Sequence, residues 1–138
     1  MVDTESGPAG TLVAVGIVVQ DLDRSLGFYT DLVGMKEVHR VDVPEKHLVE
    51  SILQFPGPPG AAMVLMHFSD GADHRYVDVG GKVAFRVDDV VGLVEVVRAA
   101  GGEVTREPSE YPGFGLIGMV KDPDGHTLEL VQAPAPGA

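Results

Sequence analysis

The chain contains an internal repeat. Residues 13–38 align without a gap on residues 81–106, at an offset of 68 positions. Three landmarks fall on one another: Ile17 on Phe85, Asp21 on Asp89, and Gly34 on Gly102. A repeat constrains the fold strongly, because each copy must adopt the same local structure, and two copies are too few for a solenoid. We therefore predict one domain built from two similar halves.

Each half is predicted to contain a strand, an amphipathic helix and three more strands. In the first half we expect a helix over 22–33 between strands at 11–20, 35–43, 47–55 and 61–68. In the second half we expect a helix over 89–100 between strands at 82–87, 103–107, 115–120 and 126–131. Asp21 and Asp89 are predicted to cap the two helices. The fold class is therefore α+β, with two βαβββ modules.

The modules span about 11–68 and 81–132, within one domain covering 11–132. The polar segment 69–80 reads as the linker between them. Residues 1–10 and 133–138 are expected to be flexible tails. Asp122 and Asp124 lie in the turn KDPDG, where proline presets φ and glycine allows positive φ, and we assign both to that turn.

Composition excludes several classes of function. The formal net charge is −11 over 138 residues, whereas nucleic-acid binding needs a basic face. No apolar run approaches the length that spans a bilayer, and the N-terminus lacks the pattern of a signal peptide. The chain has no cysteine, so it has neither disulfides nor thiolate metal sites. We expect a cytoplasmic protein with no nucleic-acid or membrane partner.

Three segments resemble the vicinal oxygen chelate superfamily, which includes glyoxalase I and the bleomycin-resistance proteins. They are VVQDLDRSLGFYTDLVGMKEV, KVAFRVDDVVGLVEVVRAAGGEV and VKDPDGHTLELVQ, in that order. The resemblance covers about residues 12–132, and its local character is similar to glyoxalase I. It implies paired modules whose curved sheets enclose a cup, with a small molecule as ligand. It also implies a homodimer, and some relatives build the cup across subunits.

The resemblance further implies a divalent metal held by the first and last strands of each module. The matching positions here are Ala14, Leu65, Lys82 and Glu129. Only Glu129 is an ordinary ligand, because Ala14 and Leu65 have no donor atom and lysine is normally cationic. A metal site needs about three or four protein donors. We therefore predict a degenerate site with no metal and no cofactor.

Strand alternation suggests what lines the cup instead, since side chains two residues apart share a face. Wholly apolar faces are assigned to packing under the helices, and mixed faces to the cup. The polar candidates are Lys82, Arg86, Glu129 and His67. The apolar candidates are Val18, Met63 and Leu65, with Ala14 and Gly16.

Structural readings of the polar candidates remain open. Lys82 and Glu129 could form an ion pair that replaces the metal, Arg86 could be solvated at the rim, and His67 could be an ordinary residue at a strand end. Tyr111 and Phe114 could form a flap over the cup or a plain hairpin.

Three functions are compatible with these residues. The first is a glyoxalase-like protein that binds a small oxygenated or monoanionic ligand, with Lys82, Arg86 and His67 as polar contacts. The alternative is a lyase or isomerase in which Glu129 or His67 is the catalytic base and Lys82 with Arg86 supplies positive charge. An unusual metal site that recruits His67 belongs to this alternative. A third possibility is a protein–protein role with an emptied cup.

Overall fold

The computed structural model describes residues 10–58, 60–74 and 80–134, so most of both predicted tails and residues 75–79 of the predicted linker lie outside the described residues. Module one contains β1 (Ala14–Val18), α1 (Leu22–Gly27), the π-helical turn η1 (Phe28–Leu32), β2 (Lys36–Val43), the 3-10 turn η2 (Pro44–Lys46), β3 (Leu48–Gln54) and β4 (Ala62–Phe68). Module two contains β5 (Val83–Arg86), α2 (Val90–Ala99), β6 (Val104–Tyr111), β7 (Gly115–Lys121) and β8 (Thr127–Gln132). The predicted α+β fold of two βαβββ modules is confirmed.

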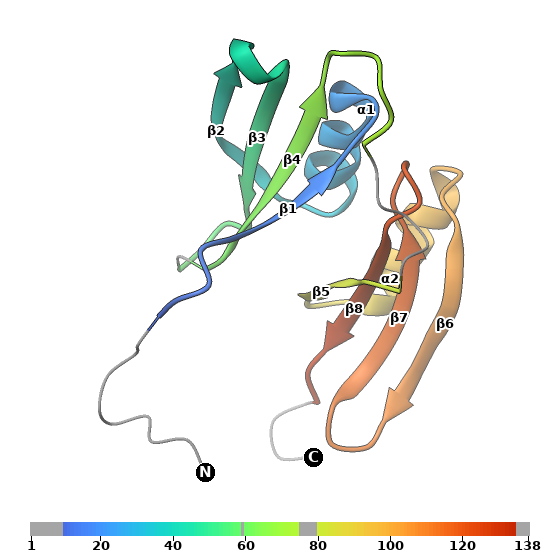
Figure 1. The fold of residues 1–138 in the computed structure, drawn as a ribbon. Helices are drawn as coiled ribbons and strands as arrows, with labels where there is room; N and C mark the ends of the chain where they lie inside the picture. The colour runs from blue at the N-terminus through green and yellow to red at the C-terminus, as the bar shows by residue number, and fades with distance from the viewer. Residues whose placement is uncertain (1–9, 59, 75–79, 135–138) are drawn as a thin grey trace.

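Each module forms one four-stranded mixed sheet, and the two sheets have the same strand order (Figure 1). The orders are β1-β4-β3-β2 and β5-β8-β7-β6. The first strand of each module pairs in parallel with the last, and the other pairs are antiparallel. The shared topology shows that the sequence repeat is a structural repeat.

Both helices begin at the predicted caps. Asp21 accepts a hydrogen bond from the Arg24 amide at 3.0 Å, and Asp89 accepts one from the Gly92 amide at 2.9 Å. These carboxylates satisfy amides that have no partner inside the helix. The predicted first helix is divided, because α1 gives way to a π-helical turn at Phe28.

Each sheet has a covered face, on which its helix packs, and an open face. In module two the helix lies close to the sheet: a side-chain carbon at Gly118 would lie 3.2 Å from Val90 and 3.3 Å from Val94. A larger residue at this position would therefore push these two valine side chains aside by a few tenths of an ångström. In module one, the covered face includes Met63, Leu65 and the residues packed against them.

The two modules share one hydrophobic core. Its buried members come from both halves: Val19, Phe28, Tyr29, Val33, Met35, Leu53, Met63, Leu65, Phe85, Val90, Val94, Val97, Val120, Leu128 and Leu130. Phe85 of β5 contacts two rings of module one edge to face, with centroid distances of 6.5 Å to Tyr29 and 5.5 Å to Phe55. The modules thus meet through their covered sides, which leaves both open faces available.

Candidate functional site

An ion pair lies on the open face of module two. The Lys82 Nζ atom is 2.7 Å from the Glu129 Oε2 atom. The Lys82 side chain is 52% exposed, whereas that of Glu129 is 17% exposed. The predicted pairing of these residues is therefore present, and its burial is shallow on the lysine side. The Glu129 carboxylate therefore lies close to the sheet, and the Lys82 ammonium lies on its solvent side.

Two arginines share this open face with the ion pair. Arg86 is exposed and lies two residues beyond Ala84, which is the register partner of Glu129. Arg106 is the register partner of Met119, and Met119 is the partner of Glu129. Because register partners point to the same side of a sheet, Arg106 lies in the same row as Glu129, two strands away.

Arg106 was missed in the reading of the sequence. Its Nη1 atom donates a hydrogen bond to the Tyr111 hydroxyl at 2.6 Å, and its guanidinium lies 5.7 Å from that ring centroid. Tyr111 therefore holds Arg106 rather than covering the face. Phe114, at the tip of the same hairpin, is 71% exposed, so the structure shows a plain hairpin within one chain.

The open face of module one is apolar along β1 and β4, and Glu50 of β3 lies beside Met66 in the same row. β1 contributes Ala14, Gly16 and Val18, and β4 contributes Met66, which pairs with Val18. A side-chain carbon at Gly16 would lie 2.9 Å from the Met66 sulfur. The absence of a side chain at Gly16 thus makes room for the Met66 thioether on this face.

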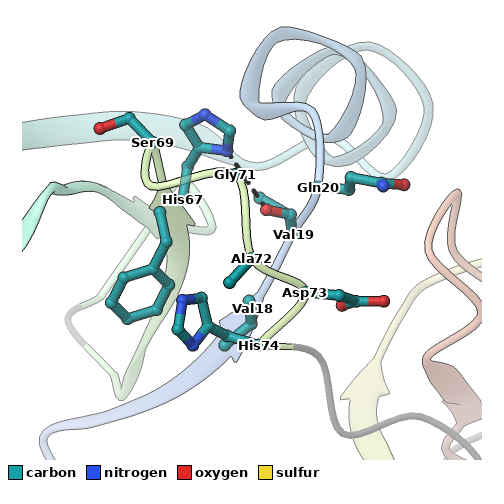
Figure 2. Close-up of a pocket in the computed structure, with 10 residues that line it drawn as sticks. Val18, Val19, Gln20, His67, Ser69, Gly71, Ala72, Asp73 and His74 are labelled. Atoms are coloured by element: carbon teal, nitrogen blue, oxygen red, sulfur yellow. Dashed lines mark hydrogen bonds between the residues drawn. The ribbon is translucent and has the colours of Figure 1, made fainter.

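A pocket of about 390 Å³ lies at the end of this face, where β1 and β4 finish (Figure 2). It contains two of the predicted ligand contacts, Val18 and His67. The His67 Nδ1 atom is 3.3 Å from the Val19 carbonyl oxygen, which ties the end of β4 to the end of β1. The remaining lining residues are Val19, Gln20, Phe68, Ser69, Gly71, Ala72, Asp73 and His74.

The far wall of the pocket is built around His74. Its ring centroid is 4.2 Å from that of Phe68, and its Nε2 atom is 2.8 Å from an oxygen of Asp70. The hydrogen bond with His74 is the main cause that lowers the pKa of Asp70. The pocket therefore has an aromatic wall of Phe68 and His74, with the carboxylates of Asp70 and Asp73 close to it.

Met63 and Leu65 do not line an open face, which corrects the prediction for both residues. They are 3% and 0% exposed, and they belong to the core beneath α1 and η1. The strand register also places Met63 on the covered face, because its partner Leu53 is completely buried. His67 shares their parity, but it lies beyond them at the end of the strand, where it reaches the pocket.

The residues at the family's metal positions do not fit a divalent ion. Ala14 has no donor, Leu65 is buried in the core, and Lys82 is bound to the remaining carboxylate. Within residues 10–58, 60–74 and 80–134, no group of three or more histidine, cysteine, aspartate or glutamate residues could hold a metal. This chemistry leaves one ordinary ligand, Glu129, already paired with a cation.

Comparisons with known proteins agree with this architecture. The family model for the Glyoxalase/Bleomycin resistance protein/Dioxygenase superfamily matches residues 11–130. A putative lactoylglutathione lyase of Brassica oleracea is 42% identical over 121 residues, which are 86% of this chain and 43% of that protein. The lactoylglutathione lyase of Haemophilus influenzae is 35% identical over 124 residues, covering 88% of this chain and 89% of that enzyme.

The same likeness appears in three dimensions. The crystal structure of glyoxalase I from Zea mays superposes with a TM-score of 0.77 at 36% identity, over 91% of this chain and 46% of that one. The chain spans less than half the length of these plant relatives. No helix among the described residues is long and apolar enough to cross a membrane. The chain belongs to the Glyoxalase/Bleomycin resistance protein/Dioxygenase superfamily.

Proposed function

We propose that this protein binds a small, partly apolar molecule that carries one anionic or carbonyl oxygen. The observation that carries the proposal is the charge on the open face of module two, where Lys82, Arg86 and Arg106 accompany a single carboxylate, Glu129. Lys82 is already neutralised by Glu129, so the arginines supply positive charge to a ligand. A guanidinium can bind a carboxylate through two parallel hydrogen bonds.

The charge of the whole chain narrows the class of ligand. A net charge of −11 repels polyanions at long range. A monoanion or a neutral carbonyl compound approaches more easily, and is then held by the local cations. The apolar part of the ligand would contact the surface formed by Gly16, Val18 and Met66.

A second copy of the chain would bring the two kinds of surface together. Within one chain the modules meet through their covered sides, and Ala14, Gly16, Lys82 and Arg86 are all exposed. Facing module one of one copy with module two of another would bury these residues around a ligand. We therefore propose a homodimer in which each cup has one wall formed by the apolar residues of β1 and β4 and one charged wall from module two.

The proposal can be tested by calorimetry with benzoate and 4-methyl-2-oxopentanoate, two monoanions with an apolar part. Both should bind, and benzamide, which is neutral, should bind more weakly than benzoate. Arg86→Lys should weaken benzoate binding, since lysine cannot make the paired hydrogen bonds. Arg86→Ala should weaken it further, by about 10- to 100-fold, the value of a charged hydrogen bond of about 1.5–3 kcal/mol.

A matched control is Arg98→Ala. Arg98 lies on α2 and pairs with Glu95 and Glu107, away from the open face, so its loss should leave benzoate affinity unchanged. Equal affinity in the wild type, Arg86→Lys and Arg86→Ala would remove Arg86 from the site. Failure of every monoanion to bind would refute the proposal as a whole.

The alternative function is a lyase or isomerase of glyoxalase type, and the names of the relatives favour it. Glu129 would take a proton from the carbon next to a carbonyl group, and Lys82 with Arg86 would stabilise the enolate oxygen. The test is to supply methylglyoxal with glutathione and measure formation of S-lactoylglutathione, with and without added Ni²⁺ or Zn²⁺. We expect no turnover. Turnover that Glu129→Gln abolishes would establish the alternative instead.

A further inference from the structure

The turn between β7 and β8 reaches across to module one. The Tyr29 hydroxyl donates a hydrogen bond to Asp122 Oδ2 at 2.7 Å. The Ser25 hydroxyl donates to Asp124 Oδ2 at 3.1 Å, and Arg24 Nη2 lies 3.4 Å from Asp124 Oδ1. Both aspartates are therefore more than turn formers, because their carboxylates are bound to α1 and η1 of the other module.

Two further hydrogen bonds from this segment end on the pocket wall. The Gln20 amide donates to Asp124 Oδ1 at 3.0 Å. The His126 Nε2 atom lies 2.7 Å from the Val18 carbonyl oxygen and donates to it. Val18 and Gln20 both line the pocket of module one. Module two thus holds the backbone of that pocket on both sides of Val19. We call Asp122, Asp124 and His126, together with their partners, the clasp.

Because the carboxylates of the clasp are buried, they fix the position of the β7–β8 turn relative to α1. Asp122 and Asp124 are 5% and 6% exposed, and Ser25 and Tyr29 are completely buried. A buried carboxylate that loses its hydrogen bonds is strongly destabilised, so the turn cannot slide along α1. The corresponding connection in module one contributes Phe55, whose ring meets that of Phe85 edge to face. Ring contacts of this kind tolerate small shifts.

We infer that the clasp positions the pocket wall of module one, so that Asp124 and His126 act on ligand binding without touching the ligand. The inference rests on the proposed function for its ligand, but its structural part does not. Within the clasp, Asp122 and Tyr29 hold the turn, Asp124 holds Gln20, and His126 holds Val18. Loosening any part should change the pocket, even when the altered residue lies outside it.

The first measurement uses the protein without ligand. Tyr29→Phe removes a hydroxyl that makes no contact with Gln20, so it tests whether the clasp acts as a unit. Amide exchange followed by NMR should be about five- to tenfold faster at Gln20 in this variant, the factor that one ordinary hydrogen bond represents. The Ile52 amide in β3 should exchange at the same rate in this variant as in the wild type, after correction for any change in global stability. Unchanged exchange at Gln20 would overturn the inference.

The second measurement is the distance between the modules. The chain has no cysteine, so single cysteines can be placed at two exposed valines, Val38 on β2 and Val96 on α2. Spin labels at both sites, diluted with unlabelled protein, should give a narrow distance distribution in the otherwise unaltered chain. Asp124→Ala should broaden it. A distribution that stays equally narrow in Asp124→Ala would contradict the inference.

The third measurement is benzoate affinity, with a destabilised variant as control. Val97→Ala removes buried core volume from α2 and should leave Gln20 exchange, label distance and affinity unchanged. His126→Ala should lower benzoate affinity about five- to tenfold. An unchanged affinity in His126→Ala would refute the link to the pocket. If benzoate does not bind the wild type at all, the proposed function fails, and the exchange and distance results still decide whether the clasp positions the wall.

Discussion

The two modules have the same topology, but the first strand of each places different chemistry on its open face. At an offset of 68, Ala14 and Val18 of β1 correspond to Lys82 and Arg86 flanking and ending β5. These positions lie on the open faces, where packing does not dictate the residue. The covered faces remained alike, and both carry valine, leucine and aromatic residues. Packing therefore determines which residues occupy the covered faces. The residues of the open faces can differ between the modules, and a function can depend on that difference.

The loop before the last strand of each module contacts the other module, and these two loops also differ in chemistry. The β7–β8 turn carries two buried aspartates with partners on α1 and η1, whereas the β3–β4 connection contributes the ring of Phe55. One contact fixes a geometry, and the other supplies apolar area. The two modules thus share a core, but the β7–β8 turn fixes their relative orientation and the β3–β4 connection adds apolar contact area.

The largest expected effect separates the covered face from the open face. Leu65→Ala should lower the free energy of unfolding by about 2–5 kcal/mol, because it leaves a cavity in the core. Val18→Ala, on the open face of the same module, should cost well under that amount. Chemical denaturation of both variants measures the difference. If the two costs were equal, Leu65 would not belong to the core, and the division into faces would be wrong.

An intermediate effect sharpens the comparison of the two connections. Tyr29→Phe should cost about 1–3 kcal/mol at neutral pH, because Asp122 loses a buried hydrogen bond. The aromatic contact of the other connection has no such polar partner. Phe55→Leu should therefore cost less, since it keeps apolar volume against Phe85. Equal losses in the two variants would show that the clasp adds nothing beyond apolar area.

The same tyrosine predicts a dependence on alkaline pH. Burial is the main cause that raises the pKa of Tyr29 well above its usual value, and the charge of Asp122 adds to the rise. An unfolded tyrosine titrates near pH 10, so the folded state holds this proton more tightly than the unfolded state. The stabilisation is complete below about pH 10 and is lost as the pH rises from there. Stability measured from pH 8 to 11 should fall more steeply in the wild type than in Tyr29→Phe.

The smallest expected effect concerns the ion pair on the charged wall. Lys82 is 52% exposed, so water screens its attraction to Glu129, and the coupling should be about 0.2–1 kcal/mol. A double-mutant cycle with Lys82→Met and Glu129→Gln measures it. A coupling of several kcal/mol would mean that the pair is buried in solution, as it would be inside a dimeric cup. Repeating the cycle at different protein concentrations distinguishes these cases.

Much of the fold could be predicted from the sequence because its signals are local. The repeat and the residue patterns around it predicted both helices and all eight strands, and the aspartate caps lie where the predicted helices begin. Alternation also assigned faces correctly in module two. Phe85 and Leu130 are buried, and Glu129 lies on the opposite side with Lys82. There, charged residues on one face and apolar residues on the other leave no ambiguity.

Alternation failed on β4, where both faces are apolar. Because His67 is the only polar side chain of β4, the face that contains it was assigned to the cup. Met63 and Leu65 share that face, so they were wrongly predicted to line the cup. His67 is compatible with the covered face because it lies at the end of the strand, beyond the residues under α1. A polar residue at a strand end therefore does not identify the face of the strand before it.

Apart from the pairing of Lys82 with Glu129, the contacts between distant segments could not be predicted. Arg106 reaches the charged face through strand register, and a bulge on either side of it obscures its parity in the sequence. Asp122 and Asp124 have the signature of a turn, which was correct, but nothing local shows that they bind Ser25 and Tyr29 about 100 residues earlier. A buried tyrosine on the apolar side of a helix was the only available signal, since its hydroxyl needs a partner.

The clasp also has a consequence for the order of folding during synthesis. Module one leaves the ribosome first, and its own strands can pair as soon as β4 has emerged. The hydrogen bonds at Val18 and Gln20 must wait for residues made about 100 positions later. Until translation passes His126, the nascent chain carries a module whose pocket wall is unfinished. Chaperones and proteases that meet the half-made protein therefore meet it in this state.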